Sequence, residues 1–287
     1  MKRALLVFVL FSLCIGAMNA DGWIDQGHQH ATTLAVTSLD GRLPQFFFKD
    51  EFILRSACTD PDDFKNKMVP HSRGTEGPDH YLDLEKLRGA PVPRTRYKLI
   101  AFCAERGIKP EHVGFLPYAV TEWTEKLAVS LYEWRNAPDE QREALSYKCL
   151  TYAGILAHYS GDLCMPLHTT IHFDGRVGKD GKSPFKGLHL KVDGLIHKVS
   201  VVPFDPTDIE PFNHEYLFEE VMAEFMRSHA LIDRVYELEQ HVPALDQEIK
   251  SEELKKFARN RLRAATRFTA ELYLTAWKIS ETLKPPY

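Results

Sequence analysis

The chain has 287 residues, which is long enough to bury a large hydrophobic core as one large domain or two small ones. Hydrophobic residues make up 44% of the sequence and charged residues 26%, a balance typical of globular proteins. The formal net charge is −4 and no long basic tract is present, which argues against non-specific binding of nucleic acid by a positively charged surface.

The first 22 residues have the pattern of a secretory signal peptide. Two basic residues precede an apolar stretch, Ala4–Ile15, of the length that such signals use. Small residues allow cleavage after either Ala20 or Gly22. We expect residues 1–22 to be removed and residues 23–287 to form a secreted or periplasmic chain. The mature chain contains no apolar run long enough to span a membrane.

Four cysteines remain after removal of the signal: Cys58, Cys103, Cys149 and Cys164. In an oxidising compartment they could form up to two disulfides, in one of three pairings. Four buried thiols are the alternative, because no tight spacing favours a particular pair. The cysteines therefore do not indicate a chemistry.

Hydrophobic spacing along the mature chain predicts a mainly α-helical protein in a single domain. No internal repeat and no run of alternating strands is visible. The segments at 69–79 and 169–186 are rich in glycine, proline or charged residues and are expected to be loops. The longest helical patterns cover residues 97–106, 118–134, 140–162, 216–238 and 252–283.

The segment from His158 to His168 contains the strongest candidate site. His158 and Asp162 are four residues apart, so a helix presents both on one face. The preceding residues 150–157 are apolar on most sides, which indicates a buried helix in which a polar pair needs a partner. Pro166 should end or bend the helix, and His168 can then turn toward the same point. These are typical zinc ligands; a buried His–Asp hydrogen bond beside an unrelated loop histidine is the alternative.

Other histidines and carboxylates repeat this chemistry. His189 and Asp193 have the same four-residue spacing, and Asp62 lies beside a proline expected to start a helix, with Asp60 and Asp63 as alternative acids. The full candidate set is His28, Asp62, His80, His158, Asp162, His168, His189 and Asp193. Five histidines and three carboxylates exceed the needs of one zinc ion and suit two or three.

Five short motifs follow one another along the chain. They are Trp23-x4-His28, Asp62-x-x-Lys65, His80-Tyr81-x-Asp83, His158-x3-Asp162-x5-His168 and His189-x3-Asp193. The ordered set resembles the superfamily that contains the single-strand-specific zinc nucleases and the bacterial zinc-dependent phospholipases C. The chain departs from that pattern at three positions: Lys65 stands where the family has arginine, and Met165 and Val192 stand where the nucleases usually have glutamine and tryptophan.

The resemblance implies a bundle-like helical fold with a trinuclear zinc cleft. One zinc ion would be held by Asp62, His80, His158 and Asp162. A second would be held by His168, His189 and Asp193. The third would be held by the free amino group and carbonyl of Trp23, by His28, and by Asp162 as a bridge. Because only a chain terminus has a free amino group, this third site would require cleavage after Gly22.

The reaction that the resemblance implies is phosphate-ester hydrolysis by metal-activated water, with Asp62 orienting the water and Lys65 neutralising phosphate charge. Tyr81 and Asp83 hold the positions that bind a base in the nucleases, so we expect single-stranded nucleic acid as the substrate. A phospholipid headgroup is the alternative, because the phospholipases carry a similar motif. An exported zinc-binding protein without catalysis is a third possibility. No stable protein partner is predicted.

Overall fold

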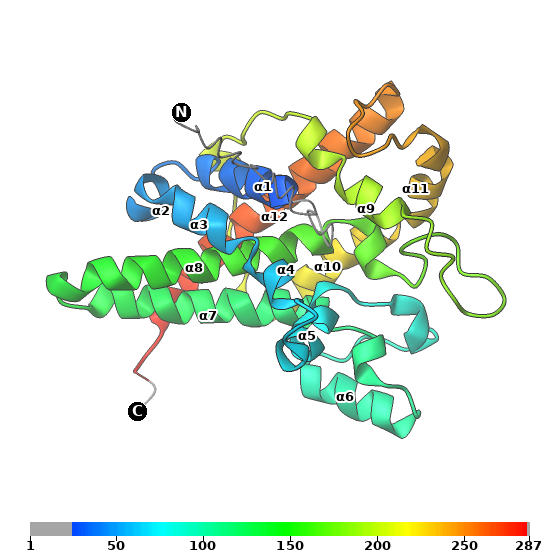
Figure 1. Ribbon diagram of the computed structural model, residues 1–287. Coiled ribbons are helices and arrows are strands. Elements are labelled where there is room, and N and C mark those ends of the chain that lie inside the picture. Colours follow the sequence, from blue (N-terminus) through cyan, green and yellow to red (C-terminus); the bar gives the residue numbers. More distant parts are fainter. Residues whose placement is uncertain (1–24, 286–287) are drawn as a thin grey trace, which may run out of the picture.

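The computed structural model describes residues 25–285, so the expected signal peptide and Trp23 lie outside the described residues (Figure 1). Within this range the chain is mainly helical and forms no β-strand, only an isolated bridge between Leu82 and Gly114. The predicted helical fold class is confirmed. The α-helices are α1 (Asp25–Thr37), α2 (Phe46–Lys49), α3 (Glu51–Ala57), α4 (Asp60–Phe64), α5 (Pro70–Glu76), α6 (Arg96–Glu105), α7 (Leu116–Asn136), α8 (Asp139–Leu163), α9 (Leu188–Asp193), α10 (Leu217–His229), α11 (Ile232–Leu238) and α12 (Glu252–Thr282).

Short 3-10 helices connect several of these elements. They are η1 (Gly77–His80), η2 (Leu84–Leu87), η3 (Pro110–His112), η4 (Pro166–Thr169), η5 (Ile196–Lys198), η6 (Pro206–Asp208), η7 (His214–Tyr216) and η8 (Glu239–His241). Prolines at the first or second position start η1, η3, η4 and η6. Proline suits that position because its fixed φ is already helical and its missing N–H would have no partner there.

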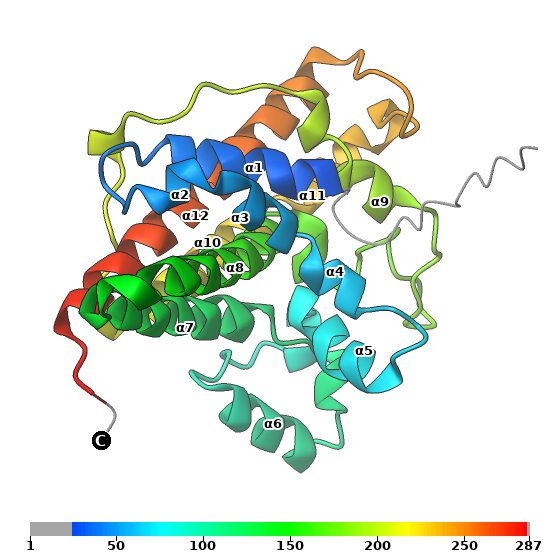
Figure 2. The ribbon, with the colours of Figure 1, turned by 60° about the vertical axis from the view of Figure 1, so that its left-hand side comes forward.

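The helix α8 lies at the centre of the molecule, between α7 on one side and α1 and α3 on the other (Figures 1 and 2). Its first two turns are exposed, whereas every residue from Ala153 to Leu163 is buried. Gly154 explains how α3 can approach so closely, because a Cβ at this position would lie 2.6 Å from the carbonyl oxygen of Leu54. The polar residues at the end of α8 are therefore enclosed by the core.

The long helix α12 holds the buried half of α8 in place. The hydroxyl of Tyr273 donates to the carbonyl oxygen of Ala153 at 2.8 Å, and the hydroxyls of Ser160 and Thr269 lie 2.6 Å apart. Tyr273 is fully buried, and burying a side chain of this size contributes about 2–3 kcal/mol. Ser251 caps the start of α12 by accepting a hydrogen bond from the N–H of Leu254.

Two expectations about local structure were wrong. Residues 69–79, expected to be a loop, contain α5 and η1, and Pro70 is the first residue of α5. The pattern at 216–238 is divided into α10 and α11, and the break follows His229, whose imidazole donates to the carbonyl oxygen of Thr169 at 3.0 Å. In both cases the local sequence signals, glycine and proline in the first and hydrophobic spacing in the second, do not decide the structure.

The four cysteines outside the signal are all free and buried. Of the two possibilities, disulfides or buried thiols, the structure has buried thiols. Burial raises the pKa of the Cys58 thiol to about 12 and that of Cys149 to about 11, which keeps both thiols protonated. Among the described residues, no helix is both long enough and apolar enough to cross a membrane.

Candidate metal centre

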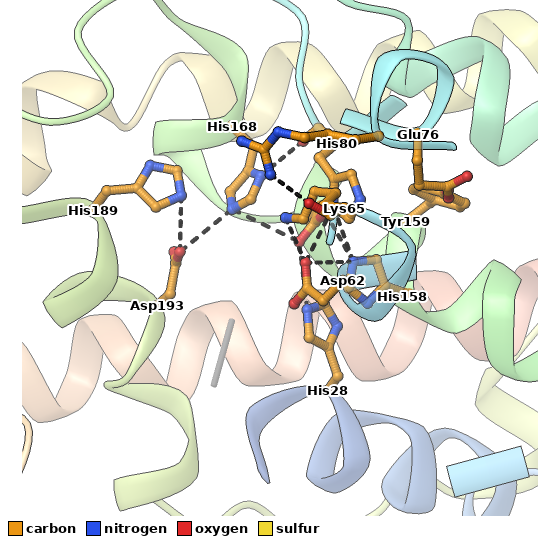
Figure 3. A network of polar contacts seen from close by, with 12 residues as sticks. His28, Asp62, Lys65, Glu76, His80, His158, Tyr159, His168, His189 and Asp193 are labelled. Atoms are coloured by element: carbon orange, nitrogen blue, oxygen red, sulfur yellow. Dashed lines mark hydrogen bonds and ion pairs between the residues drawn. The ribbon is translucent and has the colours of Figure 1, made fainter. Parts of the chain in front are cut away.

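The histidines and carboxylates singled out in the sequence come together at one end of α8 (Figure 3). They arrive from six elements: His28 from α1, Asp62 from α4, His80 from η1, His158 and Asp162 from α8, His168 from η4, and His189 and Asp193 from α9. Trp23, the remaining expected ligand, lies outside the described residues. Segments separated by more than 160 positions in the sequence thus contribute to one cluster.

The carboxylate of Asp162 lies at the centre of this cluster. Its Oδ2 is 2.9 Å from Nδ1 of His80 and 3.4 Å from Nε2 of His158. Its Oδ1 is 3.5 Å from Nε2 of His28 and 3.7 Å from Nε2 of His168. Four imidazoles from four elements therefore contact a single carboxylate that is completely buried.

The side chains fall into three groups in which the possible ligand atoms all lie within 4.8 Å of one another. The groups are His28 with His158 and Asp162, Asp62 with His80 and His158, and His168 with His189 and Asp193. In the last group, Nε2 of His189 is 2.9 Å from Oδ2 of Asp193 and Nε2 of His168 is 3.5 Å from the same atom. Each group could hold a metal ion.

Backbone carbonyls determine which imidazole nitrogens can act as ligands. The Nδ1–H of His158 donates to the carbonyl oxygen of Cys58 at 2.8 Å, and the Nδ1–H of His168 donates to that of His80 at 2.7 Å. Each ring therefore directs Nε2 into the cluster. Metal-binding histidines in proteins are oriented by hydrogen bonds of this kind.

Burial and neighbouring charges shift the pKa values of the groups in the cluster in different directions. Burial lowers the pKa of His80 to about 4, so this imidazole is neutral near pH 7. Burial also disfavours the charged form of His168, but the carboxylates of Asp162 and Asp193 outweigh that effect and raise its pKa to about 9. Burial opposes ionisation of Asp162, yet the imidazoles of His168 and His158 hold the pKa of this carboxyl well below its ordinary value.

The residues present fit metal ions. Among the described residues, Nε2 of His80, Nε2 of His168 and Oδ1 of Asp162 are buried and have no hydrogen-bond partner. Buried polar atoms that lack a hydrogen bond are costly inside a protein. Imidazole nitrogens and carboxylate oxygens that converge in groups of three are the donor set of zinc sites. Bound cations would satisfy these atoms and balance the three clustered carboxylates.

Of the three neighbouring acids in α4, Asp62 is the one that belongs to a ligand group. Lys65 lies one turn further along, and its Nζ is 2.5 Å from Oδ1 of Asp62. The Lys65 side chain is only 17% exposed. Its ammonium group therefore neutralises a carboxylate inside the cluster instead of projecting freely into the solvent.

The ligand group of His168, His189 and Asp193 depends on a further carboxylate that the motif spacing did not reveal. Asp174 is buried and accepts hydrogen bonds from the backbone N–H groups of Gly187, Leu188 and His189. These are the unpaired donors at the start of α9, which carries His189 and Asp193. Asp174 thus caps α9 from the loop that precedes it and orients both ligands.

A close backbone contact fixes the segment after His80. The N–H of Leu82 donates to the carbonyl oxygen of His168 at 3.0 Å, and the N–H of Leu116 donates to that of Tyr81 at 3.1 Å. Gly114 packs against this segment with φ +93°, and a Cβ there would lie 2.1 Å from the carbonyl oxygen of Tyr81. Only glycine fits at this position.

A cleft of about 600 Å³ opens beside the ligands. Both basic and apolar side chains line it. Its lining includes Lys65, Arg73, His80, Tyr81, Asp83, Lys86, His112, Leu167, His168, Phe173, Asp174, His189 and Leu190. Arg73, Lys86 and His112 were not foreseen, because no motif includes them and only the folded chain brings them to the cleft.

The two residues expected to bind substrate both line the cleft. The hydroxyl of Tyr81 donates to the carbonyl oxygen of Glu111 at 2.6 Å, which fixes the ring. The carboxylate of Asp83 lies 3.2 Å from Nζ of Lys86, and burial raises the pKa of Asp83 to about 6 despite that partner. His172, four residues after His168, accepts a hydrogen bond from the N–H of Val177 and belongs to none of the ligand groups.

No protein-family model matches the chain, and no curated protein matches it.

Proposed function

We propose that the mature chain is an exported zinc-dependent phosphodiesterase, and that its substrate is single-stranded nucleic acid. The observation that carries the proposal is the contact of one buried carboxylate, Asp162, with four imidazoles beside an open cleft. Metal ions held by these groups would supply an activated water and stabilise negative charge on the phosphate and its leaving group. The three ligand groups suit three ions, with Trp23 completing the site of His28 as the resemblance implies.

The residues of the chain have distinct roles in this proposal. Asp62 belongs to a ligand group and pairs with Lys65, which lines the cleft, so its carboxylate could orient the attacking water by accepting its hydrogen bond. Lys65 holds Asp62 in that position through their ion pair. Tyr81 offers the face of a fixed aromatic ring to a base, and stacking of this kind tolerates any base in a single strand.

A specific observation favours phospholipid as a second candidate substrate. Phe185 is 73% exposed, and its ring lies 5.9 Å from that of Phe173 in the cleft wall. An exposed phenylalanine beside a cleft with apolar residues such as Leu167 and Leu190 suits contact with lipid. The guanidinium of Arg73 on the same cleft suits the phosphate of either substrate.

The test is cleavage of single-stranded DNA by the zinc-loaded mature chain, purified after natural removal of the signal. We expect cleavage that an excess of chelator abolishes and that added zinc restores. Phosphatidylcholine vesicles provide the parallel assay for the second substrate. Zinc-loaded protein that hydrolyses neither substrate would contradict the proposal and favour a non-catalytic zinc-binding protein.

A further inference from the structure

The helix α5 was unexpected in the sequence, and it presents Arg73 to the cleft. The helix is tied down at both ends: the hydroxyl of Ser72 donates to the carbonyl oxygen of Phe64 at 3.0 Å, and the hydroxyl of Tyr159 donates to the carboxylate of Glu76. Tyr159 is buried next to the ligand His158 on α8. The position of Arg73 is therefore fixed relative to the metal ligands.

Arg73 differs from Lys65 in how its charge is used. The ammonium of Lys65 is committed to Asp62. Within residues 25–285, Arg73 forms no ion pair, and the one hydrogen bond of its guanidinium is donated by Nη1 to the carbonyl oxygen of Lys65. A guanidinium has five N–H donors, so most of those of Arg73 remain available to a ligand. Both residues line the same cleft as His80, His168 and His189.

A planar guanidinium suits phosphate better than an ammonium does. It can donate two parallel hydrogen bonds to two oxygens of one phosphate, whereas a lysine acts as a point charge. The motif that includes Asp62 carries lysine at position 65, so this chain has no arginine at that place. Arg73 on α5 instead places a guanidinium beside Lys65, because its Nη1 donates to the Lys65 carbonyl oxygen.

We propose that Arg73 is the phosphate-binding residue of the cleft and that Lys65 is a positioning residue for Asp62. The inference rests on the proposed phosphodiesterase function and adds a subsite to it. Arg73 would bind non-bridging oxygens of the phosphate next to the metal ligands. The subsite recognises a phosphate group as such, so it serves a nucleic acid backbone and a phospholipid headgroup equally.

Two measurements on the zinc-loaded mature chain test this assignment. The first is the dissociation constant of inorganic phosphate, measured by calorimetry for the parent, Arg73→Gln and Arg73→Lys. The second is steady-state hydrolysis of bis(4-nitrophenyl) phosphate. Lys67→Gln is the matched control, because Lys67 is exposed, nearby and absent from the cleft lining, and the substitution removes the same charge.

We expect Arg73→Gln to weaken phosphate binding by roughly 10- to 100-fold, the loss typical of a charge-assisted hydrogen bond. Arg73→Lys should recover part of the affinity, and Lys67→Gln should resemble the parent. Zinc content should be unchanged in all three variants. In hydrolysis, the loss for Arg73→Gln should be mainly in KM if the contact already forms in the bound substrate.

The outcomes separate this inference from the proposed function. Phosphate binding by Arg73→Gln within twofold of the parent, at equal zinc content, would overturn the role of Arg73. A parent chain that binds zinc and phosphate but hydrolyses no phosphodiester would contradict the proposed function while the binding data still decide about Arg73. A zinc-loaded parent that binds no phosphate would overturn both.

Discussion

The Nδ1–H of His168 donates to the backbone carbonyl oxygen of His80 at 2.7 Å, so one candidate ligand orients another. The N–H of Leu82 returns a hydrogen bond to the carbonyl oxygen of His168 at 3.0 Å. Two segments that are 88 positions apart therefore pair directly at the site. Because His80 and His168 belong to different ligand groups, loss of either segment should disturb both groups.

Substitution of Asp162 tests the whole arrangement. Asp162→Asn keeps the size of the side chain but removes the charge that contacts His28, His80, His158 and His168. We expect loss of at least one zinc ion per chain and a fall in phosphodiesterase activity of more than about 100-fold, since even outer partners of metal ligands cost 10- to 100-fold. Elemental analysis and hydrolysis of single-stranded DNA measure the two effects. Activity equal to that of the parent would refute the role of this carboxylate.

The cap on α9 predicts a more selective effect. Asp174→Ala removes the acceptor for the N–H groups of Gly187, Leu188 and His189, which loosens the helix that carries His189 and Asp193. We expect affinity for one zinc ion to fall by about 10- to 100-fold while the other sites keep theirs. Competition with a chromogenic chelator resolves the sites by affinity.

The control for that experiment lies in the same loop. Asp180 is exposed, and its carboxylate accepts a hydrogen bond from the backbone N–H of Lys182 and not from the N–H groups at the start of α9. Asp180→Ala should leave all zinc affinities unchanged. If both variants lose zinc to the same degree, the loop as a whole and not the cap of Asp174 is responsible.

Gly114 provides a stability prediction with a matched control. Gly114→Ala places a Cβ 2.1 Å from the carbonyl oxygen of Tyr81 at φ +93°, so the backbone beside His80 must move. We expect a loss of more than about 4 kcal/mol in the free energy of unfolding. Gly107 also has a positive φ, +63°, but nothing lies within 4 Å of the position of its Cβ. Gly107→Ala should therefore cost only about 1–2 kcal/mol. Equal losses by urea denaturation would show that backbone conformation, not the contact, decides.

Much of the site could be predicted because its signals are local in sequence. The four-residue spacing of His158 and Asp162 requires only a helix, and the helix expected at 140–162 is observed as Asp139–Leu163. The same reasoning holds for His189 and Asp193 on α9. Pro166 ends the helical run before η4, as its missing N–H dictates.

The features that were missed depend on contacts beyond the immediate neighbours in the sequence. Asp174 caps a helix that begins 14 positions later, and nothing in its immediate neighbours indicates such a partner. Arg73 reaches the cleft only because α5 forms, and α5 is held by Phe64 and by Tyr159 on α8. Glycine and proline near this segment favoured a loop, but Pro70 at the first helical position is compatible with a helix.

The pKa of Asp83 predicts how stability depends on pH. Burial raises this pKa to about 6 from an ordinary value of 3.8, against the opposing effect of Lys86. Between these values the folded chain holds a proton that the unfolded chain releases, so Asp83 makes the fold less stable as the pH rises from 4 to 6. Asp83→Asn cannot titrate. The free energy of unfolding of the variant minus that of the parent should therefore increase by up to about 3 kcal/mol between pH 4 and pH 7. Urea denaturation across this range, with chelator present so that metal binding does not contribute, measures the difference.

Lys86→Gln should enlarge the pH dependence in the chain that retains Asp83, because it removes the cation that favours the ionised carboxyl. A difference between Asp83→Asn and parent that stays constant with pH would mean that the Asp83 carboxyl is as well solvated in the folded chain as in the unfolded one.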